Sequence, residues 1–116
     1  MDLPVTQSED QFQAECFQWH WNNRPNERGL LFHVNQKARN QIEGNRFKAM
    51  GVVPGVSDLI YLIGPTFIEM KTEKGTQSDD QKRFQRIVEG LGYRYVICRP
   101  PISNFISLFA NLTSGA

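Results

Sequence analysis

The chain has 116 residues, of which 40% are hydrophobic and 22% are charged, and its formal net charge is +1. This length and composition are typical of a globular protein with its own core, so residues 1–116 are predicted to form a single domain. The sequence contains no apolar run of the roughly 20 residues that span a membrane, and we expect no membrane contact. The near-neutral charge gives the whole chain no attraction for nucleic acid, so any such binding must rest on local charge.

The sequence favours a reducing, cytoplasmic location. Its N-terminal stretch, MDLPVTQSEDQFQ, is polar and acidic and does not resemble a secretory signal. Cys16 and Cys98 are far apart, and each lies in an apolar pattern. Two buried free thiols are the favoured interpretation, and a disulfide is the alternative.

The first half of the chain predicts a helix, a strand and a second, weaker helix. Residues 9–21 follow an N-cap candidate, Ser8, and carry acidic residues in the first turn. Residues 30–34 are an apolar run after a polar turn and are predicted to be a strand. Residues 36–50 are compatible with a helix that an internal glycine weakens, and residues 51–55 form a Gly/Pro loop.

The second half begins with a predicted hairpin and the clearest helix. Strands at 57–63 and 66–72 are separated by a Gly-Pro turn. The helix at 78–91 has Ser78 and Gln81 at the spacing of a capping box, followed by apolar residues at helical spacing.

Two further elements complete the predicted fold. Residues 93–99 read as a strand, which the preceding helix makes parallel to the strand before it. Residues 102–112 form an amphipathic helix whose apolar stripe is core or dimer interface. The order α-β-α-β-β-α-β-α predicts an α/β fold with a central mixed β-sheet flanked by α-helices.

Glu69 and Lys71 stand two residues apart in a predicted strand and therefore share one face of it. One interpretation is a solvent-exposed ion pair at a sheet edge, and the other is half of an active site. Asp58 opens the neighbouring strand, and a favourable register brings it close to Glu69. Two such carboxylates repel each other unless a cation or a shared proton relieves them, and their hard oxygens suit Mg²⁺ or Mn²⁺. Lys71 is then placed to orient a water or to stabilise charge on a phosphate.

Glu15 is a third candidate carboxylate. Phe12, Cys16 and Trp19 mark the expected buried face of the first helix, and Glu15 falls within that stripe. Because carboxylates are seldom buried without a partner, Glu15 is a candidate for a further metal or water ligand. The alternatives are a side chain that reaches solvent at the edge of the stripe, or one paired with a buried basic group.

The motifs in this region follow one another in a recognisable series: Gly55-x-x-Asp58, Glu69-x-Lys71, Lys74-Gly75, Ser78-x-x-Gln81 and the glycine-led strand LGYRYVICR. With this series the sequence resembles the virus-type replication–repair nuclease (VRR-NUC) family, over roughly residues 9–112 and most specifically over 51–99. That family belongs to the PD-(D/E)xK superfamily of restriction-endonuclease-like folds. The resemblance implies an Mg²⁺- or Mn²⁺-dependent phosphodiesterase that acts on DNA.

Metal ligands follow from the resemblance position by position. Asp58 and Glu69 would bind the metal, and the backbone carbonyl of Met70 would add a ligand. Glu15 matches the first-helix glutamate that completes the site directly or through water.

The remaining catalytic roles also follow from the resemblance. Lys71 would be the catalytic lysine, and Gln81 would lie near the phosphate or the attacking water. One departure is Ser57, which stands where the family often has proline. Proline is not a ligand, so the departure casts little doubt on the metal site.

Compact members of the family look like homodimers that act on branched DNA in the manner of Holliday-junction resolvases. We therefore expect a homodimeric, structure-selective endonuclease for four-way junctions or flaps, in a bacterial cell or a phage-infected host. A flap-type or general nuclease of the same fold, a sequence-specific restriction endonuclease and an inactive DNA-binding module are the alternatives.

Basic residues cluster in 37–48, with one acidic residue against them and a local charge of +3: Lys37, Arg39, Arg46 and Lys48. Together with Lys74 beside the site, they are predicted to contact phosphates, and a solvated helix face is the alternative.

Four other residues, polar or aromatic, lie outside these motifs. Trp21 is predicted to stack on a base or to lie at a subunit contact. His20 and His33 lack the spacing of a zinc site, and no catalytic role is assigned to them or to Asn35.

Overall fold

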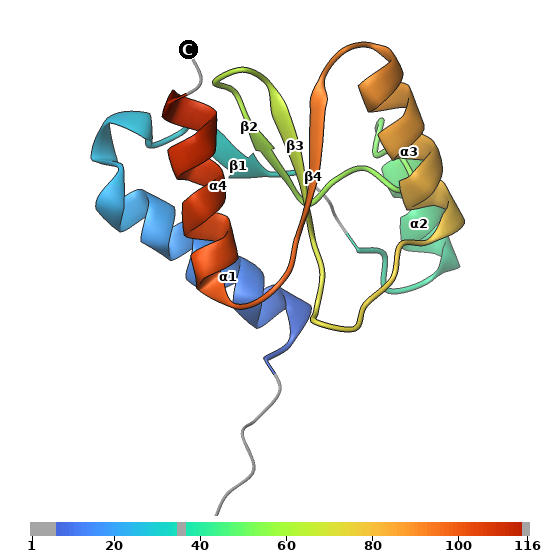
Figure 1. Cartoon of the computed structure of the whole chain (residues 1–116). Coiled ribbons are helices and arrows are strands. Elements are labelled where there is room, and N and C mark those ends of the chain that lie inside the picture. Colours follow the sequence, from blue (N-terminus) through green and yellow to red (C-terminus); the bar gives the residue numbers. More distant parts are fainter. Residues whose placement is uncertain (1–6, 35–36, 115–116) are drawn as a thin grey trace, which may run out of the picture.

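The structure, a computed structural model, describes residues 7–34 and 37–114, the last three as backbone only. Helices lie on both faces of one sheet (Figure 1). In chain order the elements are α1 (Glu9–Asn23), the 3₁₀ turn η1 (Pro25–Glu27), β1 (Leu31–His33), α2 (Gln41–Ala49), β2 (Leu59–Tyr61), β3 (Thr66–Met70), α3 (Asp79–Gly90), β4 (Arg94–Cys98) and α4 (Ile102–Ser114). The predicted α/β class is confirmed, whereas Asn35 lies outside the described residues.

The sheet has the order β1-β2-β3-β4. The first two pairings are antiparallel, and β3 and β4 are parallel, as the hairpin and the crossover helix predicted. Within the hairpin Leu59 is opposite Ile68, so the next residues outward, Asp58 and Glu69, come opposite each other. The sheet register thus produces the predicted meeting of the two carboxylates.

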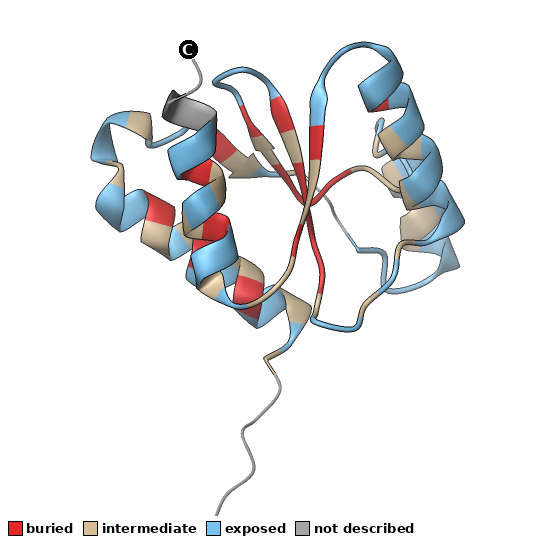
Figure 2. Ribbon diagram, in the orientation of Figure 1, coloured by how far each residue is buried: buried red, intermediate tan, exposed pale blue. Residues whose placement is uncertain are grey.

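Strand β3 packs against helices on both faces, because its side chains alternate. Ile68 and Met70 are fully buried in the main core, with side chains from α1 and α4. Figure 2 shows buried stretches on the strands and on these two helices. On the other face, the ring of Phe67 lies 5.7 Å from that of Phe84 in α3. Glu69 points to this second face, since it contacts α3.

The helix starts follow the capping residues of the sequence. Ser8 and Ser78 each accept a hydrogen bond from a backbone N–H of the first turn, and Gln11 and Gln81 complete the two capping boxes. The second helix begins at position 41 instead of 36, because the side chain of Asn40 caps it there.

The buried stripe of α1 differs from the predicted one. Phe12, Cys16 and His20 are buried, four residues apart each time, and Trp19 is only half-buried. The stripe is therefore rotated relative to the expected one, and Glu15 is exposed. The expectation that Glu15 faces inward is wrong.

A polar cluster forms around Glu27 beside this core. His20 Nε2 lies 3.1 Å from its carboxylate, Arg24 donates two hydrogen bonds to it, and the hydroxyl of Tyr61 donates one at 2.7 Å. These hydrogen bonds, that of Arg24 above all, lower the pKa of Glu27 to about 2. His20 is thus a satisfied core residue.

Cys16 and Cys98 are buried free thiols, as predicted. In the described part of the chain, no helix has both the length and the apolar character needed to cross a bilayer.

Candidate active site

Asp58 and Glu69 form the centre of the candidate site. Both are buried, with exposed fractions of 2% and 0%, and their carboxyl groups lie within hydrogen-bonding reach of each other. The backbone N–H of Met70 donates to Asp58 Oδ2 at 2.7 Å, which fixes the aspartate against β3. Adjacent strands thus hold two carboxyl groups together away from water.

Three neighbours determine the electrostatics of Glu69. The hydroxyl of Tyr95 donates to Oε2 at 3.1 Å, and Gln81 Nε2 donates to Oε1 at 3.0 Å. Burial, followed by the nearby charge of Asp58, raises the pKa of Glu69 to about 8. The carboxyl group therefore favours a proton or another positive charge beside it.

Lys71 is buried as well, with 7% of its surface exposed. Its Nζ donates to Gln81 Oε1 at 2.8 Å, and the same oxygen accepts the backbone N–H of Ser78 at 2.8 Å. Because Lys71 follows an internal strand and is covered by α3, the interpretation as an exposed ion pair at a sheet edge is excluded. Gln81 connects the lysine to Glu69, in addition to its capping role.

Two backbone features position the site. Gly55 has φ of +82°, and a Cβ there would lie 2.3 Å from the Asp80 carbonyl oxygen, so glycine lets the loop before Asp58 pack against the start of α3. Arg99 donates from Nη1 to the carbonyl oxygens of Thr72 and Gly75, at 2.9 and 2.5 Å. It thereby holds the loop that follows Lys71.

The first helix brings Glu9 near Asp58, whereas Glu15 is exposed. Burial and the charge of Asp58 raise the pKa of Glu9, while Lys37 and Lys71 act in the opposite direction. Glu15 accepts a hydrogen bond from Gln7 Nε2 at 2.6 Å instead, on the exposed side of α1. The structure therefore places Glu9 where the sequence placed Glu15.

The site offers two carboxyl groups, those of Asp58 and Glu69, as donors for a metal ion. Among the described residues, no group of three or more His, Cys, Asp or Glu side chains is arranged to hold a metal ion. Mg²⁺, however, keeps several waters and is commonly bound through one or two carboxylates. Asp58 and Glu69 fit such a site, because they are two adjacent buried carboxyl groups, one of which has a raised pKa. The Met70 carbonyl as a ligand stays a prediction.

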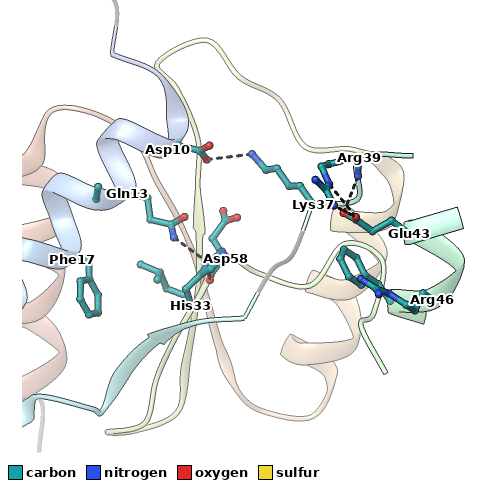
Figure 3. A pocket seen from close by; sticks show the side chains of 12 residues that line it. Asp10, Gln13, Phe17, His33, Lys37, Arg39, Glu43, Arg46 and Asp58 are labelled. Carbon is teal, nitrogen blue, oxygen red and sulfur yellow. Dashed lines mark hydrogen bonds and ion pairs between the residues drawn. The ribbon is translucent and has the colours of Figure 1, made fainter. Parts of the chain in front are cut away.

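A cleft of about 770 Å³ opens beside Asp58, between α1 and α2. Figure 3 shows Asp10, Gln13 and Phe17 on one side of it and Arg39, Glu43 and Arg46 on the other, with His33 and Asp58 between them. His33 Nδ1 lies 2.8 Å from the Asp58 carbonyl oxygen, which also accepts the Val34 N–H.

The predicted basic residues are all exposed, but three of them already have partners. Lys37 lies 3.4 Å from Asp10, and Arg39 binds Glu43 through two guanidinium nitrogens. The guanidinium of Arg46 lies over the Phe47 ring. Lys48 is on α2 and does not line the cleft, and Lys74 is in the loop after Lys71.

Sequence reasoning missed Glu9, Tyr95 and Arg99. Tyr95 carried a usable signal, because it stands opposite Phe67 in the parallel pair and so shares the face of Glu69. Glu9 was interpreted only as a favourable charge in the first helical turn. Arg99 had no local signal, since its acceptors lie more than twenty residues away.

No protein-family model and no curated protein matches the chain. Among solved structures, the fold is similar to that of a VRR_NUC domain protein, with a TM-score of 0.78 and 24% sequence identity. The match covers 97% of this chain and 92% of that one. The fold implied by the sequence resemblance is therefore confirmed.

Proposed function

We propose that this chain is a metal-dependent endonuclease that hydrolyses phosphodiester bonds in branched DNA. The observation that carries the proposal is the buried Asp58–Glu69 pair with Lys71 and Gln81 beside it. A pair of desolvated carboxylates is costly unless a cation or a shared proton relieves it, and a bound metal ion is the cation that we propose. The VRR_NUC fold of the solved neighbour supports assignment to a family of nuclease domains.

Asp58 and Glu69 are the proposed holders of Mg²⁺ or Mn²⁺, with Glu9 in the role expected of Glu15. The metal would supply Lewis-acid polarisation of the scissile phosphate and a more acidic water. Tyr95 and Gln81 fix the Glu69 carboxylate from two sides, which holds its oxygens in one orientation.

Lys71 is the proposed group that meets the charge developing on the phosphate. Gln81 accepts a hydrogen bond from the Lys71 ammonium group. This hydrogen bond holds the ammonium group next to Glu69, so that it does not extend into solvent. A positioned cation in a water-poor site stabilises such charge more strongly than one in bulk water.

A homodimer is the proposed assembly. Helix α3 leaves part of its apolar surface uncovered. Phe84 and Val88 face the sheet, whereas Ile87 and Leu91 are 56% and 70% exposed. Tyr93 adds to this exposed apolar surface. A two-fold dimer through it would present two sites to a two-fold DNA junction.

The test is cleavage of end-labelled four-way junctions, flaps and linear duplexes with Mg²⁺, Mn²⁺ or EDTA. We expect metal-dependent cutting of branched DNA that Glu69→Gln and Lys71→Met abolish, whereas Glu73→Gln, at an exposed position of the adjacent loop, retains it. Cutting of flaps alone would support a nuclease but would contradict the proposal of a junction resolvase. Binding without cutting would favour the inactive DNA-binding module, and equal cutting of linear DNA would favour a general nuclease.

A further inference from the structure

The cleft beside Asp58 has an aromatic ring on each of its two walls. Phe17 lines it from α1 and Phe47 lines it from α2, and both are half-buried, so part of each side chain is open to the cleft. The Arg46 guanidinium lies 5.6 Å from the centroid of the Phe47 ring. Aromatic rings and guanidinium planes are the surfaces on which unpaired bases stack.

The charges that line this cleft cancel. Three are positive and three are negative: Lys37, Arg39, Arg46, Asp10, Glu43 and Asp58. The Lys37–Asp10 and Arg39–Glu43 pairs neutralise two of the cations directly. The cleft therefore lacks the net positive charge that would select a phosphate backbone, although the sequence predicts +3 for this segment.

Hydrogen-bonding groups lie between the two walls. His33 Nδ1 is 2.8 Å from the Asp58 carbonyl oxygen and 3.0 Å from Gln13 Nε2. A neutral ring cannot both donate to the carbonyl and accept from the amide at that one nitrogen. If Nδ1 donates, the Gln13 amide keeps an N–H for another acceptor, and if Nδ1 accepts, His33 Nε2 carries the hydrogen. A donor for the edge of a base is thus retained in either tautomer.

We infer that this cleft is a subsite for unpaired nucleotides next to the scissile phosphate, with bases against Phe17 and Phe47. The inference rests on the proposed nuclease function and deepens it, because among branched DNAs it favours those with an unpaired strand, such as flaps, over fully paired four-way junctions. Bases in a duplex are stacked on their neighbours, so only an unpaired strand offers its ring faces to the two walls. The cleft adjoins Asp58, so a strand that occupies it lies beside the first of the two carboxyl groups.

The experiment compares two splayed duplexes that differ only in one unpaired arm, which carries thymines in one and abasic residues in the other. Binding in EDTA is measured by fluorescence anisotropy. We expect the wild type to bind the thymine arm on the order of tenfold more tightly. Phe17→Leu and Phe47→Leu keep apolar bulk but lose the ring, and they should bring this ratio close to one without weakening abasic-arm binding. Phe32→Leu, at a half-buried phenylalanine of β1 that does not line the cleft, should keep the ratio.

Thermal unfolding of each variant verifies folding, since Phe17 also packs against the core. Equal affinity for the two arms, or an unchanged ratio in both leucine variants, would overturn the subsite. Cleavage of the same DNAs with Mg²⁺ separates the two proposals. If both DNAs are cut without a preference for the thymine arm, only the subsite proposal is refuted. If the thymine arm is bound more tightly but neither DNA is cut, only the nuclease proposal is refuted.

Discussion

Lys71 donates a hydrogen bond from Nζ to Gln81 Oε1 at 2.8 Å, and the amide nitrogen of the same glutamine donates to Glu69 at 3.0 Å. Gln81 of α3 thus sets the positions of both Lys71 and the Glu69 carboxylate. These two side chains point to the same face of the sheet. The backbone N–H of Ser78 also donates to Gln81 Oε1, which fixes the amide at the start of the helix.

Gln81→Ala should lower the cleavage rate about 10- to 100-fold, because both Lys71 and Glu69 lose the group that orients them. The loss of the capping box should cost about 1 kcal/mol of unfolding free energy. Gln11→Ala is the matched control, since Gln11 occupies the same capping position in α1 and does not contact the carboxylate pair. Equal cleavage rates for the two variants would refute a positioning role for Gln81.

Glu9→Gln should reduce metal-dependent cleavage about 10- to 100-fold, and Glu15→Gln should leave it unchanged. The reason is that Glu9 interacts with Asp58 and Lys71, whereas Glu15 is exposed and bound to Gln7. Single-turnover cleavage over a range of Mn²⁺ concentrations measures the effect. The opposite ranking of the two variants would return the role to Glu15.

Tyr95→Phe should weaken Mn²⁺ binding about tenfold, because Glu69 loses the hydroxyl that donates to Oε2. Titration calorimetry with Mn²⁺ measures the affinity directly, without cleavage. Tyr93→Phe is the control, since the Tyr93 ring packs on Phe67 and its side chain is 46% exposed. An unchanged affinity in Tyr95→Phe would show that the hydroxyl does not orient the carboxylate.

Stability should fall in acid through the cluster around Glu27. A group with a lowered folded pKa stabilises the protein above its unfolded pKa and loses that contribution as the pH falls through the folded pKa. For Glu27 this window runs from its ordinary value of 4.5 to about 2. Burial also lowers the pKa of His20 below its ordinary value of 6.5, so its contribution begins to be lost below that pH.

Glu27→Gln should therefore lose on the order of 2–3 kcal/mol of unfolding free energy at pH 7 and progressively less below pH 4.5. Urea unfolding between pH 7 and pH 3 measures the difference. Glu43→Gln is the control, because the partner of Glu43, Arg39, is 84% exposed and such pairs contribute little. A constant difference across the pH range would contradict the assigned window.

Leu91→Lys should shift the protein toward monomer, since it places a charge in the exposed apolar surface of α3. Sedimentation velocity at several concentrations measures this, and Ile42→Lys, at an 82% exposed position on α2, is the control. A wild type that sediments as a monomer at all concentrations would remove the dimer proposal.

Local sequence determined the elements and part of the site. Ser8 and Ser78 start their helices through hydrogen bonds within four residues, so their capping boxes can be recognised without knowledge of the fold. The alternation of side chains in a strand likewise put Glu69 and Lys71 on one face. The position of Asp58 beside Glu69 was also predictable, because a hairpin turn pairs their two strands.

Tertiary structure decided what surrounds these residues. The rotation of α1 against the sheet buries His20 and leaves Glu15 exposed, because helix docking is set by packing with α4 and not by the helical period alone. The same docking brings Glu9 to Asp58, and the parallel register brings Tyr95 to Glu69. The sequence by itself thus determined which chemical groups the chain carries and which strand faces they occupy. Long-range packing decided which of them meet, since contacts between distant segments leave no local periodic signal.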